Sequence, residues 1–142
     1  MTTQKTKPIE KRIFSGARKT AIAKLRIKPG KGNIFFNYLP HTELGLFHKL
    51  ALLEPIRIHN QEMGEEPKYD FHIKTFSGGR ESQIEAARLA IAKALLEITG
   101  SETLKKAFIK YDRHMIVPDS RRREACKPGD SKARAKRQKS FR

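Results

Sequence analysis

Apolar and polar residues alternate near the N-terminus in a way that predicts a strand. Every second residue from Ala21 to Ile27 is apolar, and the residues between them are mostly basic. This period of two is typical of a strand with one face in the core and the other in solvent. Turn-forming residues occupy 29–32, and 33–37 again favours a strand, so we predict a hairpin over residues 20–37 with a basic solvent face. The apolar pair at 13–14 is too short to define a further strand.

The rest of the body mixes helical and extended patterns. After Pro40 we predict a helix that Thr42 caps and Pro55 interrupts or ends. Alternation returns over 69–75, which predicts a second clear strand. A long helix is expected from about 82 to 98 with Gly100 as its stop, and Ser101 then begins a further helix. This order of elements favours an α+β fold, a small sheet with helices on one face.

The positive charge of the chain lies at its two ends. Its 142 residues include 31 Lys and Arg against 15 Asp and Glu, a formal charge of +16. Residues 1–32 carry +9, residues 33–112 carry −1 and residues 113–142 carry +8. Because a small domain stays soluble with a net charge of about 2–8, two cationic ends on a neutral body indicate a polyanionic partner.

The C-terminal residues have the composition of a tail. From Asp119 onward only a few apolar side chains are scattered among ten Lys and Arg. Such a segment buries too little surface to offset its ordering entropy, so we expect it to order only against a partner. The predicted organisation is a flexible N-terminus at 1–10, a globular α+β domain at 11–118 and an extended basic tail at 119–142 that binds a polyanion.

Several classes of function lack support in the sequence. The apolar runs are far shorter than the roughly 20 residues of a membrane span, and the N-terminus does not resemble a secretory signal. Cys126 has no second cysteine for a disulfide or a zinc site, and the five histidines are dispersed. No nucleophile carries a local catalytic signature. We therefore expect no membrane partner, no bound metal or cofactor, and no enzymatic activity.

A glycine turn lies between the second predicted strand and the long helix, at Ser77-Gly78-Gly79-Arg80. Glycine amides at the start of a helix are able to bind phosphate. The segment lacks the full spacing of a P-loop or of a dinucleotide-binding motif. A structural turn and a phosphate contact both stay open on these residues alone.

Four separated motifs resemble one known family. Its signature, a glycine turn that leads into a helix, is similar to Gly78-Gly79, Gln83, Ala87 and residues 91–95. Residues 16–32 resemble its opening strands, and Leu53-Glu54-Pro55 resembles the end of its mid-domain helix. Residues 119–142 match the spacing of its basic tail. Over residues 11–142 the chain is thus similar to the small-subunit ribosomal protein S nine family, which is universal, and we favour its bacterial type.

The resemblance implies a fold and a place. The fold is a four-stranded sheet with helices on one face and a left-handed βαβ crossover, like the second domain of ribosomal protein S five. The implied place is the head of the small ribosomal subunit. The implied partners are small-subunit rRNA, peptidyl-site tRNA and neighbouring head proteins, and the protein is not expected to form a homo-oligomer. The absence of a clear transit segment favours a bacterial cytoplasm over an organelle.

The resemblance and the charge pattern together give two sets of candidate residues. The candidates for rRNA binding are Arg18, Lys19, Lys24, Arg26, Lys28, Lys31, Gly78, Gly79, Arg80, Arg121, Arg122, Arg123, Lys127, Lys132, Arg134, Lys136 and Arg137. The candidates for tRNA binding are Lys139, Ser140, Phe141 and Arg142. Arg offers phosphate a planar fork of donors, and Lys offers a mobile point charge.

Two departures from the family pattern add expectations. Ser77 stands where the family usually has a glycine, which weakens the case for a positive φ there. Phe141 stands in place of a lysine and is either a stacking residue for a base or ribose or a simple end residue. The alternative function is a free, non-specific nucleic-acid-binding protein with two basic arms; an enzyme ranks third.

Overall fold

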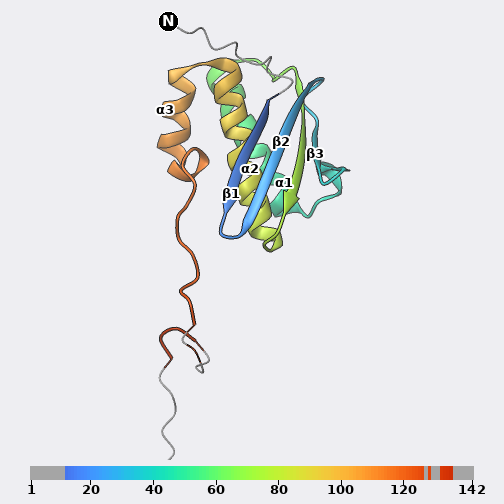
Figure 1. The fold of residues 1–142 in the computed structure, drawn as a ribbon. Helices are drawn as coiled ribbons and strands as arrows, with labels where there is room; N and C mark the ends of the chain where they lie inside the picture. The colour runs from blue at the N-terminus through green and yellow to red at the C-terminus, as the bar shows by residue number, and fades with distance from the viewer. Residues whose placement is uncertain (1–11, 127, 129–131, 136–142) are drawn as a thin grey trace, which may run out of the picture.

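Five strands form one mixed sheet in the computed structural model, which describes residues 12–126, 128 and 132–135 (Figure 1). The strands are β1 (Ile13–Arg18), β2 (Ala21–Pro29), β3 (Ile34–Phe36), β4 (Leu39–Pro40) and β5 (Tyr69–Phe76). Their order is β1-β2-β5-β3-β4; β3 and β5 are parallel, and the other neighbouring pairs are antiparallel. The α+β class is confirmed, but the sheet has five strands rather than four, because the two-residue β4 is too short to leave a sequence pattern.

Helices cover one face of this sheet and leave the other open (Figure 1). They are α1 (Leu46–Met63), α2 (Arg80–Thr99) and α3 (Glu102–Tyr111). The described residues also include the short 3-10 turns η2 (His41–Glu43) and η3 (Arg113–Met115). The apolar side chains of β2 and β5 pack beneath α2, whose inward face is rich in alanine, and α1 and α3 complete the helical layer. Among the described residues, no helix is both long enough and apolar enough to cross a lipid bilayer.

The predicted hairpin over 20–37 is wrong, although both of its strands exist. β2 pairs with β1 on one side and with β5 on the other, so β5 separates β2 from β3. The turn after β2 is tied to β5 instead: the Gly30 amide donates to the Lys68 carbonyl at 3.1 Å, and Asp70 Oδ1 accepts from the Asn33 amide at 2.9 Å. These bonds place β5 where a hairpin partner was expected, and β1, which had no clear pattern, forms the true hairpin with β2.

The helix predictions hold with two corrections, both in α1. α2 ends at Gly100, and Ser101 caps α3 by accepting a hydrogen bond from the Leu104 amide, as predicted. The N-cap of α1 is Gly45, three residues after the predicted cap Thr42, because 41–43 form the 3-10 turn η2. α1 also continues through Pro55, which was expected to interrupt or end it. Proline lacks the amide that would bond the preceding turn. Burial of Pro55 in the core offsets that loss and keeps the helix continuous.

Candidate nucleic-acid interface

Four cationic side chains share the open face of the sheet. Lys24, Arg26 and Lys28 alternate with buried residues along β2, and all three are exposed, as the sequence pattern predicted. Lys74 of β5 pairs in register with Lys24, so it lies on the same face. All four line one shallow hollow in the sheet surface. The sequence analysis missed Lys74, because only the pairing of β2 with β5 brings it beside the others.

These four charges have no acidic partner within the part of the chain that the structure describes. None of its carboxylates forms an ion pair with Lys24, Arg26, Lys28 or Lys74. Asp70, which faces Lys28 across the β2–β5 pair, instead accepts the backbone amides of Lys31 and Asn33. Like charges held on one face repel one another, so a bound polyanion lowers the electrostatic energy of this surface.

Lys19 and Lys31 lie at opposite ends of β2, outside this row. Lys19 is exposed in the turn between β1 and β2 and has a φ of +52°. Lys31 is exposed in the loop after β2, where its backbone amide donates to Asp70 at 3.0 Å. The structure thus separates the candidate cations of the N-terminal region into a central row and two flanking lysines.

The glycine turn before α2 has a structural reason for its residue types. Ser77 and Gly78 both have positive φ, +57° and +70°, so residue 77 takes the left-handed conformation although a serine there weakened the case for it. The turn holds because Gln83 Nε2 donates to the Ser77 carbonyl at 2.9 Å. A Cβ on Gly78 would lie 2.7 Å from the Cβ of Ala21, so the turn packs tightly on β2. Gly79 is the N-cap of α2 and Arg80 is exposed beside it.

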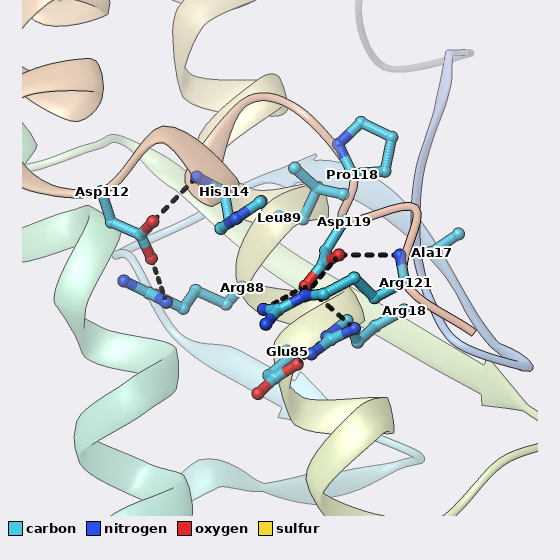
Figure 2. Close-up of a pocket in the computed structure, with 10 residues that line it drawn as sticks. All are labelled: Ala17, Arg18, Glu85, Arg88, Leu89, Asp112, His114, Pro118, Asp119 and Arg121. Carbon is cyan, nitrogen blue, oxygen red and sulfur yellow. Dashed lines mark hydrogen bonds and ion pairs between the residues drawn. The ribbon is translucent and has the colours of Figure 1, made fainter. Parts of the chain in front are cut away.

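Arg18 pairs with carboxylates at the point where the C-terminal tail begins (Figure 2). Its guanidinium bonds Glu85 of α2 and pairs with Asp119 at 3.1 Å, and its side chain is only 17% exposed. Asp119 also accepts from the backbone amide of Arg121 at 2.8 Å and from the Arg121 guanidinium at 2.7 Å. The Arg121 hydrogen bonds, with a smaller effect of Arg18, hold the pKa of Asp119 well below its ordinary value. This joint fixes the start of the tail against β1 and α2.

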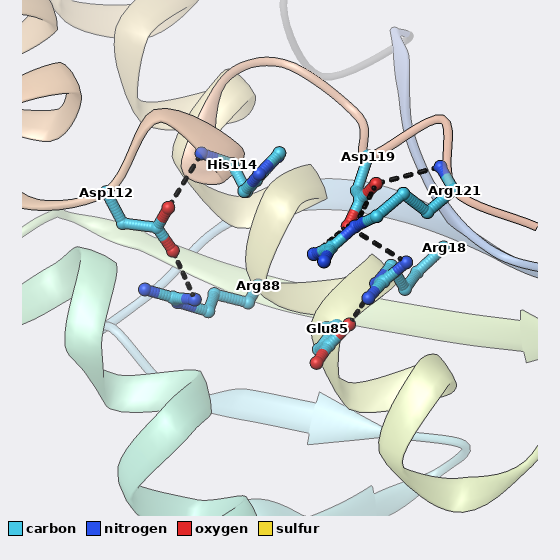
Figure 3. Close-up of polar contacts among 7 residues, drawn as sticks. All are labelled: Arg18, Glu85, Arg88, Asp112, His114, Asp119 and Arg121. Atoms are coloured by element: carbon cyan, nitrogen blue, oxygen red, sulfur yellow. Dashed lines mark hydrogen bonds and ion pairs between the residues drawn. The ribbon is translucent and has the colours of Figure 1, made fainter.

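A second set of polar contacts lies beside this joint (Figure 3). Arg88 of α2 pairs with Glu54 of α1 at 2.6 Å and with Asp112 at 3.0 Å. Asp112 also accepts the His114 amide at 2.8 Å, which closes η3. The hydroxyl of Tyr111 donates to Glu54, and that hydrogen bond raises the pKa of the phenol. Glu54, part of a motif that pointed to the family, therefore joins three helices.

The remaining tail candidates lie partly within the described residues. Arg122, Arg123, Lys132 and Arg134 are exposed, and Arg134 pairs with Glu124 at 2.9 Å. The other tail candidates lie outside the described residues: Lys127, Lys136, Arg137, Lys139, Ser140, Phe141 and Arg142. Within 12–126, 128 and 132–135, no three His, Cys, Asp or Glu side chains gather as metal ligands would.

Comparison with known proteins identifies the family. A family model described as Ribosomal protein S9/S16 matches residues 16–142. The small ribosomal subunit protein uS9 of Desulfurococcus amylolyticus is 41% identical over 133 residues, which cover 92% of this chain and 91% of the relative. The uS9 of Methanococcus maripaludis is 40% identical over 130 residues, which cover 89% of this chain and 95% of the relative. Both relatives are archaeal and give no support to the expected bacterial type. The chain belongs to the ribosomal protein S9/S16 family.

Proposed function

We propose that the protein is a structural, non-catalytic constituent of the small ribosomal subunit, that its body binds rRNA in the subunit head, and that its C-terminal tail contacts peptidyl-site tRNA. Family membership carries the first part of this proposal. The row of unpaired cations on the open sheet face supports the second part. The tRNA contact rests on the family resemblance of residues 119–142, and neighbouring head proteins are the further partners that it implies.

The open face suits RNA better than it suits other anions, because its charges are spaced along strands. Lys24, Arg26 and Lys28 follow one another at alternate positions of β2, so they present a line of donors to a line of phosphates. Arg18 and Arg121 contribute differently. Their charges pair with Asp119 and Glu85, so their role in this proposal is to orient the tail. Arg122 and Arg123 follow; both are exposed, and neither forms an ion pair with a carboxylate of the described residues.

Variants that lack the positive charges of β2 test the rRNA contact. Replacement of Lys24, Arg26 and Lys28 by Gln removes three cations of the open face. The control replaces Lys105, Lys106 and Lys110, three exposed lysines of α3, which belongs to the helical layer. Binding to small-subunit rRNA is measured over a range of salt concentrations. We expect the slope of log K against log salt to fall by roughly 0.7–0.9 for each phosphate that is no longer neutralised, and the control to keep its slope. Equal slopes in both variants would reject the assignment of this face.

The tRNA contact needs its own experiment. Lys139→Gln with Arg142→Gln removes two cations at the end of the tail without shortening it. Small subunits that carry this variant should bind peptidyl-site tRNA more weakly, while rRNA binding by the body stays unchanged. Co-sedimentation with small subunits at high salt separates this proposal from the alternative of a free, non-specific nucleic-acid-binding protein. Unchanged tRNA affinity would count against the role of residues 139–142.

The crossover between β3 and β5 belongs to the same proposal. These two strands are parallel neighbours joined through α1, which is a βαβ unit. We propose that this unit has the left-handed form that the family resemblance implies.

A further inference from the structure

Aromatic rings lie among the cations of the open sheet face. Phe35 of β3 and His72 of β5 are paired in register, and their rings stack with centroids 4.8 Å apart and planes 9° apart. Tyr38 and Phe76 lie beside them, with 82% and 41% of their surface exposed. All four rings line the same hollow as Lys24, Arg26, Lys28 and Lys74. The open face is therefore a mixed aromatic and cationic surface.

The rings and the lysines lie close enough to act on one ligand. Lys74 Nζ is 5.6 Å from the ring centroids of both Tyr38 and Phe76, and Lys24 Nζ is 5.3 Å from that of Phe76. A nucleotide offers a flat base and an anionic phosphate that are joined through one sugar. A ring with an ammonium group at its side matches both halves of such a ligand, because the base stacks on the ring and the phosphate meets the lysine.

Tyr38 occupies a backbone position that disfavours a side chain. Asn37 and Tyr38 form the two-residue turn between β3 and β4, with φ of +48° and +71°. Two-residue hairpin turns with positive φ at both positions strongly prefer Asn-Gly. Asn37 follows that preference and is anchored to Thr75 by hydrogen bonds at 2.9 Å. Tyr38 departs from it, and its exposed ring gives the fold little burial in return. Such strain collects at functional positions.

The composition of the face selects among possible partners. A paired RNA helix keeps its bases stacked inside and offers proteins mainly phosphates and ribose, so it leaves no base on which exposed aromatic side chains could stack. A protein partner would have to be strongly acidic to neutralise four cations that form no ion pair with any carboxylate of the described residues. An unpaired RNA segment meets both requirements, because its bases are free to stack and its backbone is uniformly anionic.

His72 fits this surface as a neutral ring. Burial is the largest influence on its pKa and lowers it, the charge of Lys28 lowers it further, and Asp70 opposes both. At neutral pH the imidazole is therefore uncharged, so it stacks on Phe35 as an aromatic ring. The charged groups near His72 are Arg26 and Lys28 on the neighbouring strand β2, and Lys74 and Asp70 on its own strand β5.

We propose that the open sheet face binds an unpaired segment of RNA, whose bases stack on Tyr38, Phe76 and the Phe35–His72 pair while the four cations contact its phosphates. This inference rests on the proposed function, because it names the form of rRNA that the body takes. It adds a requirement that phosphate contacts alone do not make, namely the aromatic rings.

Substitution of the strained tyrosine tests the inference without risk to the fold. Tyr38→Gly removes the ring and places the preferred residue in the turn, so thermal stability should be equal or higher. The full chain is titrated at moderate salt with two probes, an oligouridylate of about 12 nucleotides and an RNA duplex of similar length. Loss of one stacked base should weaken oligouridylate binding roughly 5- to 150-fold, with duplex binding unchanged. Phe76→Ala should act in the same direction.

Two controls make the result specific. Phe47→Ala removes a ring with the same exposed fraction, 82%, from α1 in the helical layer, and it should change neither affinity. Tyr38→Trp keeps an aromatic ring and should retain oligouridylate binding. If Tyr38→Gly and Phe76→Ala leave the oligouridylate affinity unchanged, or weaken both probes equally, stacking is rejected. The proposed rRNA contact still stands in that case if the triple Gln variant of β2 has a lower salt slope than the α3 control. It fails separately if the two slopes are equal.

Discussion

Gly16 lies in β1 where this strand crosses α2, and the structure leaves no room there for any side chain. A Cβ on residue 16 would lie 2.0 Å from the backbone carbonyl oxygen of Ala86 and 3.0 Å from the amide nitrogen of Ala90. Ala86 and Ala90 are fully buried, so strand and helix approach each other through small residues. The atoms in the way belong to a helix backbone, which cannot turn aside as a flexible side chain can.

Gly16→Ala should therefore destabilise the body strongly. Real Cβ atoms stay at least about 3 Å from such an oxygen, so α2 must retreat from β1 by about 1 Å. Overpacking of this kind costs typically 1–3 kcal/mol and occasionally more, and the retreat also loosens the packing of α2 on β2. Because the φ of Gly16 is not positive, the alanine would otherwise gain about 0.5–1 kcal/mol from its smaller unfolded-state entropy. Because the overlap is with helix backbone, the upper end of the overpacking range applies, about 3 kcal/mol. After the entropic gain, we expect a net loss of about 2 kcal/mol.

Urea unfolding of the full chain measures this loss as a lower midpoint at constant m-value. The matched control is Gly79→Ala, because a Cβ on Gly79 meets nothing within 4 Å and its φ is −99°. That variant should lose only about 0.5–1 kcal/mol, the cost of a poorer N-cap residue without any steric overlap. If Gly16→Ala unfolds at the same urea concentration as Gly79→Ala, the close approach of β1 to α2 is refuted.

Two further predictions concern the glycine turn and the root of the tail. Ser77→Gly should raise the melting temperature by a few degrees, since the left-handed conformation of Ser77 costs a residue with a Cβ about 1 kcal/mol; an unchanged or lower value in a thermal melt would contradict this. Asp119→Asn should lower stability at neutral pH and speed tryptic cleavage after Arg121, because the joint with Arg18 is broken. The Arg121 hydrogen bonds lower the pKa of Asp119, so its contribution to stability is complete above pH of about 4, declines below it and is gone under the folded-state pKa. The stability difference between the parent protein and Asp119→Asn should therefore shrink below that pH; a difference that grows in acid would show that another group is responsible.

Local patterns predicted the elements better than their arrangement. The alternation along β2 and β5 and the helical spacing of α2 depend on which residues face the core, and a short stretch of sequence carries that information. The position of β5 between β2 and β3 depends on bonds such as that of Asp70 with the Asn33 amide, which no local pattern reveals. Pro55 shows the same limit, because core packing decided that α1 continues through it.

The candidate site divides along the same line. The cations of β2 were predictable because one strand sets their common face. Lys74, Tyr38 and Phe76 join that face only through strand pairing, so composition and spacing offered no reason to select them. Arg18 was predicted from its charge and from the family resemblance of residues 16–32. Its pairing with Glu85 and Asp119 depends instead on α2 and the tail reaching the end of β1.

The central position of β5 has a consequence for the order of synthesis and assembly. A growing chain that ends before Tyr69 already carries every cation of β2, but it lacks the strand that completes the sheet between β2 and β3. Such a chain offers RNA a set of loose charges rather than a shaped face, and its long-range pairing must wait for β5. The proposed recognition of RNA by the open face therefore requires that the body has folded, while an unfolded nascent segment is limited to non-specific attraction.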